Sequence, residues 1–264
     1  MAKSKKNRND IPIFLLIILP LLAIGISSFA IFKGVHNYIT TSDYFRIREL
    51  KMEGITDARY LSLMKDEILG TNIFRVNARK LSERIKRRFP NLYSVTVRRF
   101  LPSQLLIIAK ERLPVAVVKR DVYYIFDAEG VVLSSMTQSV LTSLPLIVGL
   151  ENRLQKIRVG TAYSLGQLHK ALALAKTLKT HAYQIQTSLS KNERRSITKI
   201  DAGQPPNLIF YLGDDIQVKI GDGDFEDRLD LLPAILRSIG ADVSNVKYID
   251  LRPKEPVVAM KNKK

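Results

Sequence analysis

Residues 47–116 decide the fold, and they read IRELKMEGITDARYLSLMKDEILGTNIFRVNARKLSERIKRRFPNLYSVTVRRFLPSQLLIIAKERLPVA. Apolar residues alternate with polar ones at both ends, as in half-buried strands, and recur every three or four positions in the middle, as in amphipathic helices. Gly70 ends the first helical pattern, and Asn77 is an N-cap for the second. Two helices on one face of a three-stranded sheet would make a compact α+β domain. The predicted elements are a strand at 44–53 with a phase break near Glu49, helices at 61–68 and 77–89, and strands at 92–101 and 105–111, within a domain at 44–112.

A larger, mostly antiparallel β domain with two helices is predicted at 113–260. Two apolar stripes indicate helices at 164–181 and 225–239, with His169 on the flank of the first and His181 at its end. Pro233 lies inside the second helix, so we expect a kink there or a later start. The remaining runs, bounded by Gly, Pro and Asp, predict strands. These runs are 115–118, 122–126, 131–133, 144–149, 196–201, 208–212, 216–220, 246–251 and 257–260.

Upstream, residues 11–32 form an uncharged run of 22 residues. A membrane-spanning helix needs about 20 apolar residues, and such helices accept an internal proline such as Pro20. Four basic residues precede the run and only Lys33 directly follows it, which predicts a cytoplasmic tail at 1–10 and extracytoplasmic domains. A cleaved signal peptide is the alternative, although its apolar region usually spans about 7–15 residues. Residues 33–43 are predicted as a juxtamembrane linker and 261–264 as a basic tail.

The chain has 264 residues with 42 Lys and Arg against 25 Asp and Glu, and residues 33–120 hold 19 basic but only 8 acidic residues. Nucleic acid is not the predicted partner, because no nucleic-acid-binding signature is present and the anchor places this block outside the cytoplasm. Anionic lipid headgroups fit better, since their attraction acts close to the membrane. A basic surface without a dedicated ligand is nevertheless the preferred interpretation.

Sequence motifs for catalysis or cofactor binding are missing. The chain has no Cys and three His, which removes thiol catalysis and disulfides and disfavours a metal site. No G-x-S-x-G, Walker A or G-x-G-x-x-G motif occurs, so we predict no catalytic motif, cofactor, metal or small-molecule substrate. An acidic cluster lacks EF-hand spacing, and we interpret it as a hairpin turn and a helix N-terminus rather than a calcium site. It comprises Asp214, Asp215, Asp222, Asp224, Glu226 and Asp227.

Several stretches in this order resemble the bacterial cell-division family FtsQ/DivIB. Besides 47–116, which is similar to a POTRA domain, they are YYIFDAEGVV at 123–132, LPLIVG at 144–149, FYLGDDIQVKIGDG at 210–223 and VKYIDLRPKEPVVAM at 246–260. The resemblance implies a non-enzymatic, single-pass inner-membrane scaffold at the division septum. It further implies binding of FtsB/DivIC-like and FtsL-like proteins through the C-terminal strands, and of other division proteins through the POTRA-like domain.

The last strand is the candidate partner-binding site. A terminal strand often lies at a sheet edge, where unpaired backbone groups accept an added strand. In the alternative interpretation, these strands are internal core. Two other functions also stay open: an anchored extracytoplasmic cell-wall enzyme, and a POTRA-containing assembly or secretion component. The predicted partner-binding residues are Tyr248, Leu251, Arg252, Val257, Val258 and Met260.

Overall fold

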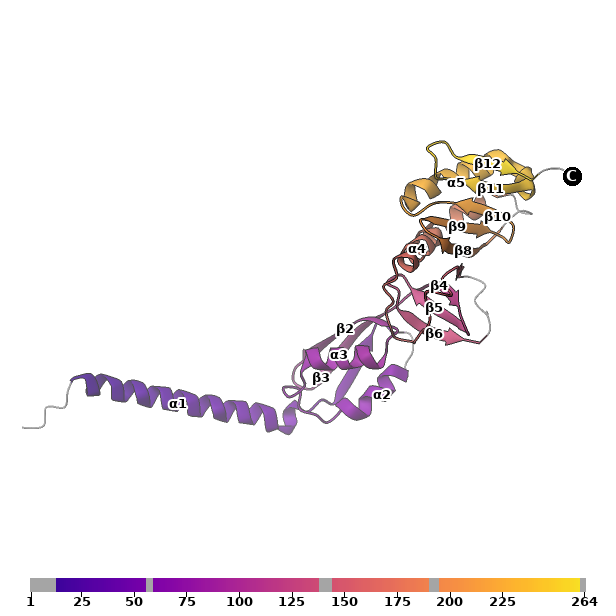
Figure 1. Ribbon diagram of the computed structural model, residues 1–264. Helices are drawn as coiled ribbons and strands as arrows, with labels where there is room; N and C mark the ends of the chain where they lie inside the picture. The colour runs from indigo at the N-terminus through magenta and orange to yellow at the C-terminus, as the bar shows by residue number, and fades with distance from the viewer. Residues whose placement is uncertain (1–12, 56–58, 138–143, 190–194, 262–264) are drawn as a thin grey trace, which may run out of the picture. The chain divides into compact units, whose positions relative to one another are not determined.

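The computed structural model describes residues 13–55, 59–137, 144–189 and 195–261, which form two compact units (Figure 1). The small unit comprises the described residues up to 85 together with 94–110, and the large unit comprises 86–93 together with those from 111 onward. The predicted α+β class is confirmed: an N-terminal apolar helix, a small strand–helix–helix–strand–strand region and a larger sheet with two helices.

Helix α1 (Ile13–Thr41) opens the small unit. Its segment Ile17–Thr41 has a mean hydropathy of 2.0 over its most apolar window and no buried residue, so by length and composition it can cross a membrane. The helix runs nine residues beyond the predicted end at 32, so most of the stretch 33–43 is helical. In its last turn the hydroxyls of Thr40 and Thr41 donate to carbonyls of the preceding turn, at 2.8 and 2.7 Å.

The end of α1 is fastened to the rest of the small unit by Asn72. The Asn72 amide Nδ2 donates to the carbonyl oxygens of Ile39 and Ser42, at 2.9 and 3.3 Å. The Asn72 Oδ1 accepts from the amide of Phe74 at 2.9 Å, and the side chain is buried. A buried amide with both ends bonded holds its neighbours in one arrangement. The chain between the helix and the first strand is therefore held in place.

The three-stranded sheet has the order β1-β3-β2 (β1 Glu49–Glu53, β3 Gln104–Glu111, β2 Leu92–Phe100). Strand β1 runs parallel to β3, with Leu50 opposite Leu105. Alternate residues of β3 are buried, because the apolar faces of helices α2 (Arg59–Ile68) and α3 (Ala78–Arg88) share their core. The Asn77 side chain caps α3 as predicted, accepting from the amide of Lys80 at 3.0 Å.

The predicted strand at 44–53 is wrong in its first half. Residues Asp43–Phe45 form a 3-10 turn, η1, and the strand begins at Glu49, where the phase of the alternation breaks. The intervening backbone bonds a loop instead: the amide of Ile47 donates to Thr71 O and that of Ile73 to Phe45 O, both at 2.9 Å. The alternation of apolar and polar residues at 44–48 thus reflects burial against that loop. It does not reflect pairing within the sheet.

The large unit contains one nine-stranded sheet in the order β12-β11-β10-β9-β8-β7-β4-β5-β6. Five of its eight strand pairs are antiparallel, and β10/β11, β7/β8 and β4/β7 are parallel. The strands are β4 (Pro114–Lys119), β5 (Tyr123–Asp127), β6 (Val132–Met136), β7 (Leu146–Val148), β8 (Ile197–Gln204), β9 (Asn207–Leu212), β10 (Ile216–Lys219), β11 (Val246–Asp250) and β12 (Val257–Met260).

Helices α4 (Gly166–Thr187) and α5 (Phe225–Ile239) pack together, and their apolar stripes share a core with inward-facing residues of the sheet. Ile200, Phe210, Val218 and Ile249 point into this core from successive strands, and the residues that alternate with them lie on the other face. The 3-10 segment η2 (Gly240–Asn245) joins α5 to β11.

Two predictions about these helices are corrected. Helix α4 extends to Thr187, so His181 lies within it rather than at its end; the buried Ile185 carries the apolar face onward. Helix α5 starts at Phe225, so the later start considered because of Pro233 is wrong. The missing amide of Pro233 is outweighed by burial of Leu229, Leu232 and Leu236, since tertiary packing overrides local propensity.

Candidate partner-binding edge

Among the described residues, β12 is the outermost strand of the large sheet, beside β11. The amide of Lys261 donates to Asn245 O at 2.7 Å, toward the β11 side. Because N–H direction alternates along a strand, the amides of Val257 and Ala259 also face β11, whereas those of Val258 and Met260 face the free edge. The edge therefore offers a short row of backbone groups for strand pairing.

A lysine fastens the end of this edge strand. The Lys261 Nζ donates to Asp215 Oδ2 and to Ser244 O, each at 2.9 Å. Burial opposes ionisation of Asp215, but the hydrogen bond from Lys261 and the charges of Arg195 and Lys261 outweigh it and hold the pKa of Asp215 below its ordinary value. The end of β12 is thus kept against the sheet.

The predicted partner-binding residues fall into two groups. Val257 and Met260 are accessible, at 49% and 45% exposure, and Tyr248 is half-buried. Val258 packs partly against the core, and Leu251 is only 1% exposed. Leu251 follows β11 directly and its amide donates to Lys219 O at 2.9 Å, which extends the parallel ladder and turns its side chain inward. A partner therefore cannot reach the side chain of Leu251.

Arg252 is held by its own unit. Its Nε donates to Asp250 Oδ1 at 2.8 Å and its Nη1 to Asn207 Oδ1 at 3.0 Å. The hydrogen bond from Arg252 lowers the pKa of Asp250, although burial works against it. Arg252 therefore ties β11 to the start of β9, which sequence reasoning about a binding hot spot does not anticipate.

Tyr248 belongs to a row of side chains on the sheet face opposite the helices. The strand register places Lys199, Tyr211, Gln217, Tyr248 and Ala259 opposite one another from β8 to β12. Lys219 Nζ lies 3.9 Å from the ring centroid of Tyr248, and Lys199 Nζ lies at the same distance from that of Tyr211. Such cation–π contacts fix the rings. Because Ala259 is small, the ring of Tyr248 has only a methyl group between it and the free edge.

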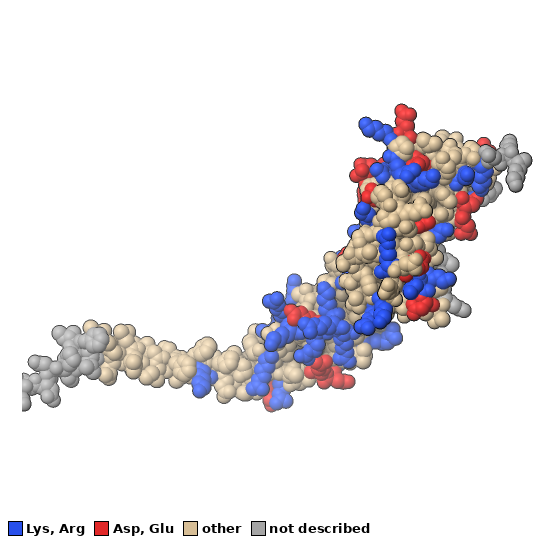
Figure 2. Space-filling view, viewed as in Figure 1, with Lys and Arg blue, Asp and Glu red and all other residues tan. Residues whose placement is uncertain are grey.

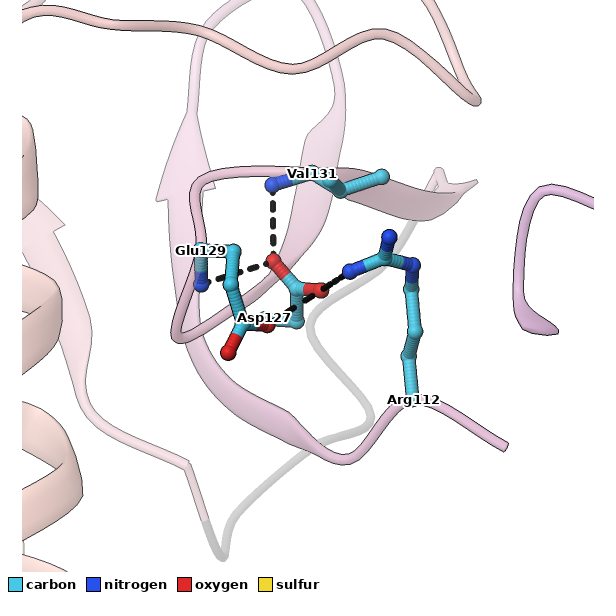
Figure 3. A network of polar contacts seen from close by, with 4 residues as sticks. All are labelled: Arg112, Asp127, Glu129 and Val131. Carbon is cyan, nitrogen blue, oxygen red and sulfur yellow. Dashed lines mark hydrogen bonds and ion pairs between the residues drawn. The ribbon is translucent and has the colours of Figure 1, made fainter. Parts of the chain in front are cut away.

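The most buried carboxylate among the described residues serves the turn between β5 and β6 (Figure 3). Asp127 Oδ1 accepts from the amides of Glu129 and Val131, at 3.1 and 2.7 Å, and Oδ2 pairs with Nη1 of Arg112. Glu129 lies on the outer side, 3.4 Å from the same Nη1. Both oxygens of Asp127 are occupied, so the Asp127 carboxylate serves to close the turn.

The acidic cluster at 214–227 is spread over separate contacts. Asp215 pairs with Arg195 and Lys261, and Asp222 pairs with Lys170 at 2.8 Å. The turn at 213–215 joins β9 to β10, and α5 begins with acidic residues in its first turn, but the side chain at its N-cap, Asp224, makes no capping bond. In the described residues, no group of three or more His, Asp or Glu side chains could hold a metal ion.

Comparison with known proteins covers nearly the whole chain. Residues 116–252 match the family described as cell division protein FtsQ/DivIB, C-terminal, and residues 45–112 match the POTRA domain of FtsQ type. The chain is 30% identical to the cell division protein FtsQ of Syntrophotalea carbinolica, over 94% of this chain and 87% of that protein. It is 29% identical to that of Geotalea daltonii, over 86% and 80%, and 27% identical to that of Geobacter sp. strain M21, over 80% and 76%.

The fold and its exposed edge define a class, namely proteins with one N-terminal apolar helix, a POTRA domain and a β domain that ends in an edge strand. Within that class, the chain belongs to the FtsQ/DivIB family of bacterial cell-division proteins. The apolar helix and the family together indicate a single-pass membrane protein with a role in cell division.

Proposed function

We propose that this protein is a non-enzymatic scaffold of the division septum, anchored in the inner membrane by α1 with residues 1–10 in the cytoplasm. Its POTRA domain (44–112) and β domain (113–260) lie outside the cytoplasm and recruit division proteins. FtsB/DivIC-like and FtsL-like proteins are the partners of the β domain, and other division proteins those of the POTRA domain. The free edge of β12, with its outward amides at Val258 and Met260, is the observation that carries this proposal.

Partner binding occurs by strand addition to β12. The added strand pairs with the backbone of β12, and its alternate side chains lie beside Val257 and Tyr248 on the helix-free face. The proposed contact residues are therefore Tyr248, Val257, Val258 and Met260, with Arg252 at the rim and Leu251 left out. The most buried described carboxylate, Asp127, is committed to a structural turn, which supports a structural rather than a catalytic role for that residue.

The substitution Met260→Pro tests whether the backbone N–H of residue 260 pairs with an added strand. Proline removes the outward amide and leaves the bonds between β12 and β11 in place, because edge strands accept proline. Loss of one main-chain hydrogen bond of about 1 kcal/mol should weaken binding of an FtsB-like partner about fivefold. Titration of the labelled partner onto the full chain in detergent measures this. Met260→Ala, which keeps the amide, is the control; equal affinities of the two folded variants would rule out pairing at this position.

The proposed topology gives a second test. A reporter that is active only outside the cytoplasm, fused after Lys264, should be active, because the basic tail before α1 favours the cytoplasmic side. The same fusion to a reporter active only in the cytoplasm is the control and should be silent. The purified protein should retain residues 1–10, and a mature N-terminus at Ile31 would show that the apolar segment is a cleaved signal.

A further inference from the structure

A polar recess lies where α1 meets the POTRA domain. Its volume is about 620 Å³, and its lining includes Thr40 and Thr41 from the helix end, Thr71 and two arginines, Arg46 and Arg75. Arg46 pairs with the exposed Asp43 at 2.8 Å. Within the described part of the chain, no carboxylate lines the recess and none pairs with Arg75. Asp43 thus compensates Arg46, and Arg75 leaves the recess with a positive charge that no described carboxylate pairs.

The surrounding surface adds to this charge. Helix α3 begins two residues after Val76, the last lining residue of the recess along the chain. It holds six basic residues and one acidic residue, Glu83. Two of its arginines are paired, Arg79 with Glu83 and Arg84 with Glu67, in exposed ion pairs. Figure 2 shows Lys and Arg side chains crowded over the domain that carries α3. The basic block of the sequence is thus concentrated on the domain next to the anchor.

The length of α1 sets the distance of this recess from the bilayer. If the uncharged run at 11–32 fills the hydrocarbon core, the nine helical residues 33–41 rise about 13 Å beyond it. The headgroup layer occupies about 5–8 Å on each side of the core. The recess then opens a few ångströms above the headgroups, within about one Debye length at physiological ionic strength. Arginine side chains at its rim can span that gap.

We propose that this recess binds the phosphate of an anionic phospholipid headgroup in the leaflet from which α1 emerges. Guanidinium groups form paired hydrogen bonds with phosphate oxygens, and both Arg75 and Arg46, the latter shared with Asp43, line the recess. Asn72 holds the helix end against the same wall, so the recess keeps its position above the membrane. The proposal rests on the anchoring of α1 in a bilayer, which is part of the proposed function.

The test uses the full chain in lipid nanodiscs, either of phosphatidylcholine alone or with added phosphatidylglycerol. Hydrogen exchange of the backbone amides at 70–77 should be about fivefold slower in the anionic discs, because a bound headgroup that stabilises this segment by about 1 kcal/mol lowers its open population by that factor. The difference should vanish in the Arg46→Gln, Arg75→Gln double variant. It should also fall steeply at about 0.5 M salt, where the Debye length is only a few ångströms.

The control variant removes the same charge elsewhere. Arg153→Gln with Arg158→Gln deletes two exposed arginines of the large unit and should keep the lipid dependence. Equal exchange in both kinds of disc, or equal effects of the two double variants, would overturn the headgroup site while leaving the anchor intact. Failure of the chain to enter discs at all would overturn the anchor and, with it, this site.

Discussion

Replacement of Arg112 by alanine is expected to lower the free energy of unfolding of the large unit by about 3–5 kcal/mol, because Asp127 would keep a buried charge without its partner. The side chains of Arg112 and Asp127 are 11% and 1% exposed, so bulk water solvates the Asp127 carboxylate poorly. The amides of Glu129 and Val131 would still donate to Asp127, but they carry no full charge. Urea unfolding of the full chain in detergent, followed by near-UV circular dichroism of its tyrosines, measures the loss.

Two further variants separate the buried charge from lost packing. Arg112→Ala combined with Asp127→Asn should recover part of the stability, since the amide keeps an acceptor for the Val131 N–H and carries no charge. Lys170→Ala breaks an exposed pair with Asp222, with both side chains 44% exposed, and should cost no more than about 1 kcal/mol. If Arg112→Ala and Lys170→Ala lowered the free energy of unfolding equally, the buried ion pair of Arg112 and Asp127 would contribute no more to stability than an exposed one.

Truncation of Tyr248 to alanine should weaken binding of an FtsB-like partner by about 2 kcal/mol or more, which exceeds tenfold in affinity. The ring lies on the helix-free face, opposite the small Ala259 of the edge strand, where an added strand would cover it. Lys219 over the ring fixes its orientation, so little entropy is lost when a partner packs on it. Titration of the labelled partner onto the full chain in detergent gives the affinity.

Tyr211 is a matched control for Tyr248. It lies on the same face with Lys199 at the same distance over its ring, but it belongs to β9, two strands further from the edge. Tyr211→Ala should therefore change the affinity little, and Tyr248→Phe should keep most of it. Comparable losses for Tyr211→Ala and Tyr248→Ala would mean that the partner covers the whole face rather than the edge. Far-UV circular dichroism checks that each variant is folded.

Local patterns predict most of the elements, and tertiary contacts explain the exceptions. The stripe of Leu229, Leu232 and Leu236 places α5 at the bounds that the structure has, in spite of Pro233. The first half of the strand predicted at 44–53 fails because the backbone of 44–48 pairs with a loop remote in sequence. The three parallel pairings of the large sheet join strands that are distant along the chain, and no local pattern reports such pairing.

Sequence patterns predict the candidate partner-binding edge only in part. The position of β12 at the sheet edge follows the general tendency of terminal strands, and the structure places it there. Burial of Leu251 was not foreseeable, because it depends on a bond to Lys219 on a neighbouring strand. The Lys219–Tyr248 contact likewise requires the parallel register of β10 and β11, in which Tyr248 lies opposite Gln217.

The helical join between anchor and POTRA domain also sets a direction. Each residue of an α-helix turns the chain by about 100° and advances it by about 1.5 Å. Helix α1 continues to Thr41, and Asn72 donates hydrogen bonds to carbonyl groups at its end. These bonds restrict rotation of the POTRA domain about the axis of α1. One residue more or fewer between 33 and 41 would turn the domain by more than a quarter of a circle about the helix axis. The length of this segment therefore fixes the azimuth of the POTRA domain about the axis of α1.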